Sequence, residues 1–194
     1  MRELAILSFV TLDGVMQAPS QPDEDRSGGF SSGGWAAPYW EEAMAQVGRV
    51  AMAEPYDMLF GRRTYDLFAG HWPDAEPGPA AERLNAARKY VATSRPDGLT
   101  WGPVTALSGD VAAQIAALKR QDGPLLQVHG STRLIQLLRA HDLIDEYRLW
   151  TFPVTVGTGK RLFDDGEETS RPLTLRLSET TTNGVQMTVY RRAR

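Results

Sequence analysis

Residues 58–66 place two arginines and a threonine directly after a strand-like apolar run. Gly61 separates that run from Arg62, Arg63 and Thr64. A turn from strand into helix leaves backbone N–H groups unpaired, and the helix dipole adds partial positive charge at the same point. Arginine adds a full charge and a planar fork that suits phosphate oxygens. The segment has the chemistry of a phosphate-binding turn, although one isolated turn of this kind is better explained by solvated arginines.

A second segment repeats the arrangement. Residues 125–128 are apolar and strand-like, and His129, Gly130, Ser131 and Thr132 follow at the start of a helical pattern. Two hydroxyl groups beside a helix N-terminus favour an anion, although serine and threonine also cap helices that bind nothing. Two such turns together suit a pyrophosphate.

A third polar group follows the strand-like run 89–94. Ser94 and Arg95 stand at its carboxyl end, which is the edge where ligands collect in open α/β sheets. These two side chains can hold a further phosphate, such as the adenosine 2′-phosphate of NADP, although a solvated loop arginine explains Arg95 equally simply.

Alternating strands and helices must position these groups. Strand-like runs cover residues 4–10, 57–60, 89–94, 104–107 and 125–128, and helical patterns cover 38–53, 64–70, 109–119 and 131–140. Three strand-like runs without helices between them follow at 147–156, 173–177 and 185–190, and Asn183-Gly184 predicts a hairpin turn before the last. The pattern predicts an α/β fold with a mostly parallel, mixed central sheet, flanking helices and antiparallel C-terminal strands, in one domain over 1–194.

Composition narrows the class of protein. The chain has 194 residues, 42% hydrophobic and 23% charged, with a net charge of −3 and no cysteine. The small net charge argues against a nucleic-acid-binding protein, and the lack of cysteine excludes disulfides and thiolate metal sites. No apolar run is long enough to cross a bilayer, so we expect a cytoplasmic protein without a membrane partner. The Gly-, Ser- and Pro-rich residues 17–34 are expected to form a lid.

The order of these motifs resembles the dihydrofolate reductase superfamily. It runs from Leu12-Asp13-Gly14 through the turns at Gly61 and Gly130 to Gly157-Thr158-Gly159-Lys160-Arg161, and it covers nearly the whole chain. Within the superfamily the chain looks most like the branch that contains the reductase domain of the riboflavin-biosynthesis deaminase/reductase. The resemblance implies a three-layer fold in which NADPH lies across the carboxyl ends of the strands.

The resemblance also implies a role for each cofactor-side residue. Gly61, Arg62, Arg63 and Thr64 match the family's Gly-Arg-x-Thr at the cofactor phosphates, and Ser94 and Arg95 fall at the adenosine phosphate. His129, Gly130, Ser131 and Thr132 match the turn beneath the pyrophosphate and nicotinamide. Folate reductases have two adjacent glycines where this chain has His129-Gly130.

The substrate side is less clearly marked. Asp13 matches an Asp-Gly turn that borders nicotinamide and substrate in the riboflavin-type enzymes, although Asp-Gly is also a common turn former. The folate reductases carry an acid near the position of Ala45. Glu42, one turn earlier, is the candidate replacement, although a solvated glutamate also suits a helix N-terminus.

Aromatic and hydroxyl side chains complete the expected substrate site. Trp35 and Trp40 are expected to stack on a planar ring, and Thr151 aligns with a threonine that faces the substrate in folate reductases. Lys160 and Arg161 are candidate partners for a ribose phosphate. The histidines lack metal-site spacing, so no metal is expected.

These expectations describe an NADPH-dependent reductase of a small heterocyclic or carbonyl/imine substrate. It is similar to the enzyme that reduces 5-amino-6-(5-phosphoribosylamino)uracil in riboflavin synthesis. The alternative is a non-catalytic member that binds a nucleotide or another phosphorylated metabolite. The C-terminal strands are expected to allow a homodimer, as in the riboflavin-type relatives.

Overall fold

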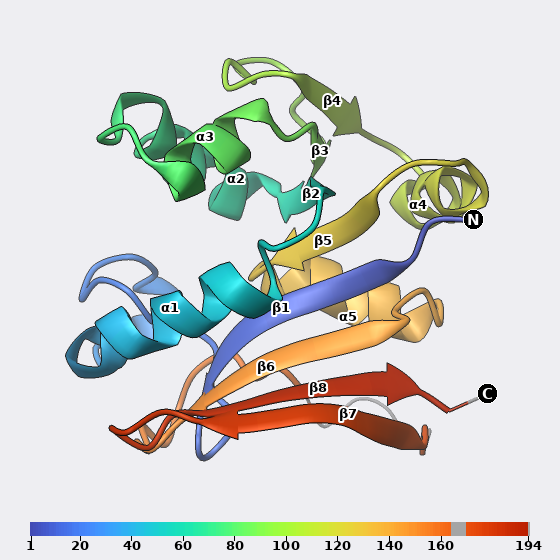
Figure 1. Cartoon of the computed structure of the whole chain (residues 1–194). Coiled ribbons are helices and arrows are strands. Elements are labelled where there is room, and N and C mark those ends of the chain that lie inside the picture. Colours follow the sequence, from blue (N-terminus) through green and yellow to red (C-terminus); the bar gives the residue numbers. More distant parts are fainter. Residues whose placement is uncertain (164–169, 194) are drawn as a thin grey trace.

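The computed structural model describes residues 1–163 and 170–193 and is built on one eight-stranded sheet (Figure 1). The strand order across the sheet is β4-β3-β2-β5-β1-β6-β8-β7. The strands are β1 (Leu4–Thr11), β2 (Tyr56–Gly61), β3 (Lys89–Ala92), β4 (Val104–Leu107), β5 (Leu125–His129), β6 (Glu146–Phe152), β7 (Leu173–Thr180) and β8 (Gln186–Arg192).

The pairing confirms the mixed sheet that the sequence predicts. Strands β4, β3, β2, β5, β1 and β6 are joined by parallel ladders, whereas β8 pairs antiparallel with both β6 and β7. The central strands β1, β2 and β5 are buried along most of their length, which is typical of parallel strands covered on both faces. Their carboxyl ends lie at one edge of the sheet.

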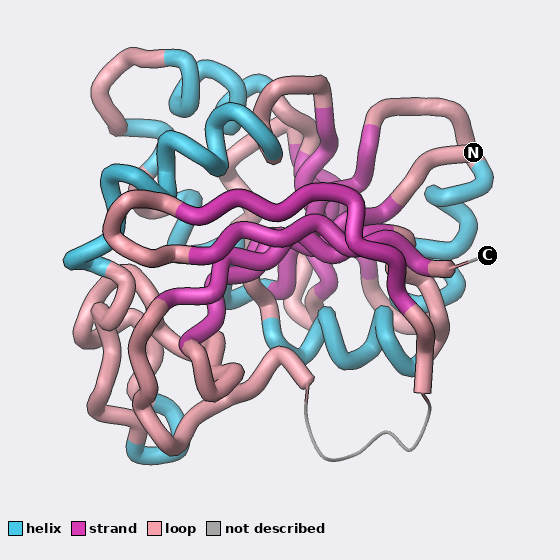
Figure 2. The backbone as a smooth tube through the Cα atoms, turned by 60° about the horizontal axis from the view of Figure 1, so that its bottom comes forward, coloured by secondary structure: helices cyan, strands magenta, loops and turns pink. Residues whose placement is uncertain are grey.

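Helices cover both faces of the sheet, so the molecule has three layers (Figures 1 and 2). Helices α4 and α5 pack on one face, and α1, α2 and α3 on the other. The helices are α1 (Trp40–Val50), α2 (Arg62–Ala69), α3 (Pro79–Ala86), α4 (Val111–Arg120) and α5 (Thr132–Ala140), with short 3-10 turns at Ser27–Gly29, Ala37–Tyr39 and Trp72–Asp74.

Two elements differ from the sequence-based prediction by more than three residues. The strand expected over 147–156 ends at Phe152, because Pro153 has no N–H to continue the ladder. Helix α3 was not predicted: its alanines give little hydrophobic periodicity, and only Ala81 and Leu84 are buried. Among the residues described, no helix is both long and apolar enough to span a membrane.

Candidate active site

A cleft of about 1760 Å³ opens at the carboxyl ends of the central strands. Typical small-molecule pockets measure roughly 300–1,000 Å³, so this cleft has room for a dinucleotide and a second ring. All ten residues that the sequence assigns to the cofactor line it: Gly61, Arg62, Arg63, Thr64, Ser94, Arg95, His129, Gly130, Ser131 and Thr132. We call residues 61–64 and 129–132 the two phosphate turns.

Ser131 joins the two phosphate turns. Its hydroxyl accepts a hydrogen bond from the Gly61 N–H at 2.9 Å and lies 2.9 Å from Thr64 Oγ1. Ser131 has φ of 69° and ψ of 63°, a left-handed conformation that is uncommon for a residue other than glycine. Neither α2 nor α5 has a side-chain cap on its first N–H groups. Two helix N-termini therefore present backbone donors to one cleft.

Arg62 has partners within the protein. Its guanidinium group pairs with Asp66 at 2.8 Å and donates to the carbonyl oxygens of Arg95, at 2.6 Å, and Asp97, at 2.9 Å. Arg62 therefore ties the loop after β3, which carries Ser94 and Arg95, to the first phosphate turn. This positioning role was not foreseen from the sequence.

Asp25 connects residues 17–34, which we call the Gly-rich loop, to two basic residues. Its carboxylate lies 2.7 Å from Arg63 Nη1 and 2.5 Å from Lys160 Nζ. Burial opposes its charge, but hydrogen bonds from Lys160 and Ser27 outweigh that effect and lower the pKa of Asp25 to about 2. The loop expected to be a lid lines the cleft through several residues of 17–27 and is fastened at Asp25.

The part of the cleft beside α1 and α2 is apolar. Its lining includes Phe9, Trp40, Met44, Val47, Phe68 and Trp72, which we call the aromatic lobe. Phe9 and Trp40 meet edge to face with ring centroids 5.7 Å apart. The charged lining residues lie on the Gly-rich loop, at Lys160, at Arg95 after β3, at Asp66 on α2, and in or next to the phosphate turns.

His129 ends β5 next to the aromatic lobe. Its ring lies among aromatic neighbours, with centroids 5.7 Å from Phe68 and 6.0 Å from Phe60. Burial, with a smaller contribution from the Arg148 charge, lowers the pKa of His129 to about 4. The side chain is therefore neutral at physiological pH.

Asp13, in the turn after β1, is bonded to groups within the protein. Its carboxylate accepts hydrogen bonds from the Thr11 hydroxyl at 2.5 Å and from the Gly157 N–H at 2.7 Å, and these bonds lower its pKa despite some opposing desolvation. It is not part of the cleft lining. Arg161 donates to the Asp13 and Gly157 carbonyl oxygens, so these residues hold two loops together.

Glu42 also points elsewhere. Its carboxylate accepts from the Thr182 N–H at 2.8 Å and from the Thr182 hydroxyl at 2.6 Å. These bonds lower its pKa and fasten α1 to the turn between β7 and β8. Glu42 is absent from the lining of the cleft, so the structure does not place it as a proton donor there.

Of the three residues expected to contact the substrate, only Trp40 lines the cleft. Trp40 is 37% exposed. Trp35 is buried, donates from Nε1 to the Gln17 carbonyl oxygen at 2.8 Å and packs on Phe152, so it supports the Gly-rich loop from behind. Thr151, on β6, is not part of the lining.

Sequence reasoning missed Phe9, Phe68 and Asp25 as cleft residues. The two phenylalanines look like ordinary core positions of a strand and a helix, and nothing local distinguishes Asp25 within its polar loop. Only the fold brings them together. The residues described contain no group of three His, Cys, Asp or Glu side chains arranged to hold a metal ion.

Comparison with known proteins places the chain in a family. The family model described as RibD C-terminal domain matches residues 2–189. The uncharacterized protein YyaP of Bacillus subtilis (strain 168) is 28% identical over 139 residues, which are 69% of this chain and 72% of that protein. The uncharacterized YwjB of the same organism is 32% identical over 76 residues, 39% of this chain and 44% of that protein.

Two solved structures share the fold. A putative riboflavin biosynthesis protein from Shewanella sp. PV-4 superposes with a TM-score of 0.64 at 20% identity, over the whole of both chains. Dihydrofolate reductase from Enterococcus faecalis, complexed with NADP(H) and RAB-propyl, has a TM-score of 0.58 at 15% identity, over 99% of this chain and 97% of that one. The fold is therefore dihydrofolate reductase-like, and the chain belongs to the RibD C-terminal domain family.

Proposed function

We propose that the protein is an NADPH-dependent reductase of a small planar substrate. One observation carries the proposal: three sequence segments with phosphate-binding chemistry line a single cleft, and Ser131 joins two of them. The cleft also has an aromatic lobe beside these segments, so it has room for a cofactor and a second ring. The dihydrofolate reductase that shares the fold was solved with NADP(H), which supports the choice of cofactor.

The donors in the cleft fit a dinucleotide phosphate. The uncapped N-termini of α2 and α5, with the hydroxyl groups of Thr64 and Thr132, would hold the pyrophosphate. Arg63 would add a full charge there, and Ser94 and Arg95 would hold the adenosine 2′-phosphate. When bound, NADPH supplies a hydride to the substrate.

The protein's own contribution is positioning and exclusion of water. The aromatic lobe offers Trp40 as a flat, partly exposed surface for a ring, and closely packed apolar walls strengthen the electrostatic interactions within the cleft. The loop at 17–27 lines part of the cleft, and Asp25 fastens it to Arg63 and Lys160. These residues orient two rings without supplying covalent chemistry.

A comparison of NADPH with NADH tests the proposal. Wild-type protein is titrated with each dinucleotide in a calorimeter, and we expect saturable binding that favours NADPH. Arg95→Ala should weaken NADPH binding about tenfold or more and leave NADH binding within about twofold, because only NADPH carries the 2′-phosphate. Arg88→Ala, an exposed arginine outside the cleft lining, is the matched control.

Turnover then separates the reductase from a non-catalytic binding protein. A reductase oxidises NADPH in the presence of an electron-poor heterocycle, quinone or imine, whereas a binding protein holds the dinucleotide unchanged. If neither NADPH nor NADH binds saturably, both the cofactor assignment and the reductase proposal are refuted.

A further inference from the structure

The aromatic lobe contains almost no polar groups. Among the lining residues that the structure describes, the titratable side chains nearest in sequence to the lobe are those of Asp66, which is paired with Arg62, and His71, which is solvent-exposed. His129 lies next to the lobe at Phe68. A charged substrate group would lose its hydration there without gaining an ion pair, which is strongly unfavourable for a buried charge. The lobe therefore suits an uncharged ring.

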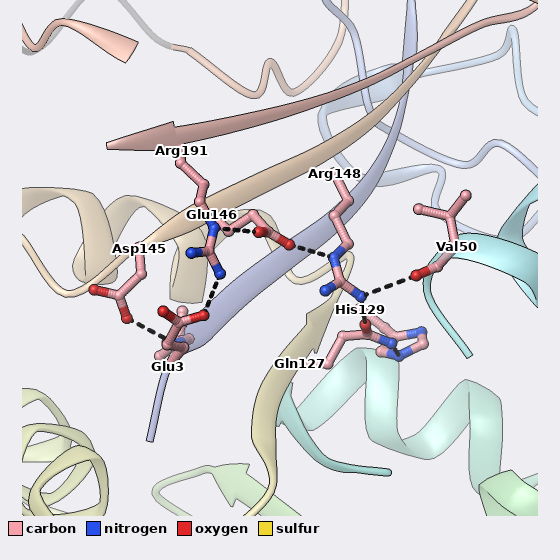
Figure 3. Close-up of polar contacts among 9 residues, drawn as sticks. Glu3, Val50, Gln127, His129, Asp145, Glu146, Arg148 and Arg191 are labelled. Atoms are coloured by element: carbon pink, nitrogen blue, oxygen red, sulfur yellow. Dashed lines mark hydrogen bonds and ion pairs between the residues drawn. The ribbon is translucent and has the colours of Figure 1, made fainter. Parts of the chain in front are cut away.

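A row of polar side chains leads from His129 across the sheet (Figure 3). Arg148 Nη1 donates to Gln127 Oε1 at 3.0 Å, and Gln127 Nε2 lies 2.9 Å from His129 Nε2. Arginine has donors and no acceptor, so the Gln127 atom that it contacts must be the oxygen. The other end of the Gln127 amide is then the NH2 group, and it donates to His129.

The orientation of Gln127 determines the tautomer of His129. Because Nε2 accepts a hydrogen bond, the proton of the neutral imidazole resides on Nδ1. His129 Nδ1 has no hydrogen-bond partner among the described residues, and His129 lines the cleft. The ring therefore has a spare N–H donor.

Arg148 is itself held in place. Its Nε donates to Glu146 at 2.6 Å, and the second oxygen of Glu146 accepts from Arg191 Nε at 2.8 Å (Figure 3). Gln127 is fully buried and Glu146 is 6% exposed, so solvent has little access to this row. The row gives His129 a single protonation pattern instead of a mixture of two tautomers.

We propose that the aromatic lobe binds an uncharged planar ring compound that carries a carbonyl or imine acceptor, and that His129 Nδ1–H donates to that acceptor. The proposal rests on the proposed reductase function and names its substrate class. It favours a non-phosphorylated substrate over a sugar phosphate. Lys160 and Arg161, the expected phosphate partners, are bonded to Asp25 and to loop carbonyl oxygens. Arg148 and Gln127 act as positioning residues.

Nitrogen NMR of the histidine side chains tests the tautomer without ligand. In wild-type protein at neutral pH, we expect His129 Nδ1 to have the shift of a protonated ring nitrogen and Nε2 that of an unprotonated one. Gln127→Glu should bring a proton onto Nε2, because the new carboxylate accepts both from Arg148 and from His129. An Nε2–H tautomer in the wild type would overturn the proposal.

Equilibrium dialysis of NADP⁺-saturated protein tests the substrate class with three probes of similar shape. These are 1,4-naphthoquinone, naphthalene, which has no acceptor, and 1,4-naphthoquinone-2-sulfonate, which is charged. The chain has no cysteine to react with the quinone. We expect naphthoquinone to bind about tenfold more tightly than either of the others, since one well-made buried hydrogen bond is worth about this factor.

Two variants connect that preference to His129. His129→Leu should abolish the preference for naphthoquinone over naphthalene, whereas His129→Asn, whose amide N–H can replace Nδ1–H, should retain it. An unchanged preference in His129→Leu, equal binding of the sulfonate, or no binding of naphthoquinone to wild-type protein would each overturn the proposal. NADPH titration of the same preparations reports folding and cofactor binding separately, so failure of this proposal is distinguishable from failure of the reductase proposal.

Discussion

Replacement of Ser131 tests how the two phosphate turns are held together. Ser131 has two separable features: a hydroxyl group that accepts from the Gly61 N–H, and a left-handed backbone conformation with φ of 69°. Ser131→Ala removes the hydroxyl and keeps a Cβ in the left-handed conformation. Ser131→Gly also removes the hydroxyl but relieves the steric cost of that backbone.

The magnitudes follow from these two features. The hydroxyl accepts from the partly buried Gly61 N–H and also contacts Thr64 Oγ1, and its loss costs about 1 kcal/mol of the free energy of unfolding. Relief of left-handed strain restores roughly 1 kcal/mol in the glycine variant. We therefore expect Ser131→Ala to be less stable than wild type by about 1 kcal/mol, and Ser131→Gly to be close to wild type. Both should weaken NADPH binding about fivefold, which corresponds to roughly 1 kcal/mol, because the two turns lose their connection.

Urea unfolding gives the free energies, and calorimetric titration gives the dissociation constants. Ser178→Ala, an exposed position on β7, is the matched control and should change neither quantity. The reasoning is refuted if Ser131→Ala is as stable as wild type, or if the glycine variant is the less stable of the two.

Three further predictions concern charge, pH and assembly. Asp25→Asn frees Arg63, which is 58% exposed, for the pyrophosphate, so the dissociation constant for NADPH should fall about two- to fivefold at low salt; an increase would contradict this. An ordinary histidine has a pKa of 6.5, whereas that of His129 is about 4, and this difference corresponds to roughly 3 kcal/mol of the free energy of unfolding. The unfolded chain takes up this proton first, so stability should decline as pH falls from 6.5 towards 4, and His129→Asn should flatten that part of a urea-unfolding profile. If β7 forms the expected homodimer, Leu175→Lys on its 50% exposed leucine should shift the sedimentation coefficient from dimer to monomer, and a monomeric wild type would refute that expectation.

The meeting of the two phosphate turns in one cleft was predictable because their sequence signals are local. A glycine between an apolar strand and a helix marks each phosphate turn within a few residues, as at Gly61 and Gly130. Parallel strands bring their carboxyl ends to the same edge of the sheet, so the two turns had to come close together. Neither step requires knowledge of distant contacts.

The partners of the two candidate acids were not predictable because they come from distant parts of the sequence. Asp13 is bonded to Gly157, 144 residues away, and Glu42 to Thr182, 140 residues away. Both acids occupy positions at which an active-site carboxylate is plausible, and their partners can be identified only in the folded chain. The role of His129 likewise depends on Arg148, on a strand that is not adjacent to β5 in the sheet.

The most direct test of the central claim, that this cleft holds NADPH, is a calorimetric titration of wild-type protein and Gly61→Ala. Gly61 has φ of −77°, and an added Cβ would meet Ser131 only at an ordinary 3.5 Å, so the backbone itself does not require glycine there. We predict saturable NADPH binding to the wild type. Gly61→Ala should unfold at the same temperature or higher and bind NADPH about tenfold more weakly, because the methyl group would occupy the approach of the phosphate to the turn. Undetectable binding to the wild type, or equal binding to a normally folded Gly61→Ala, would contradict the account.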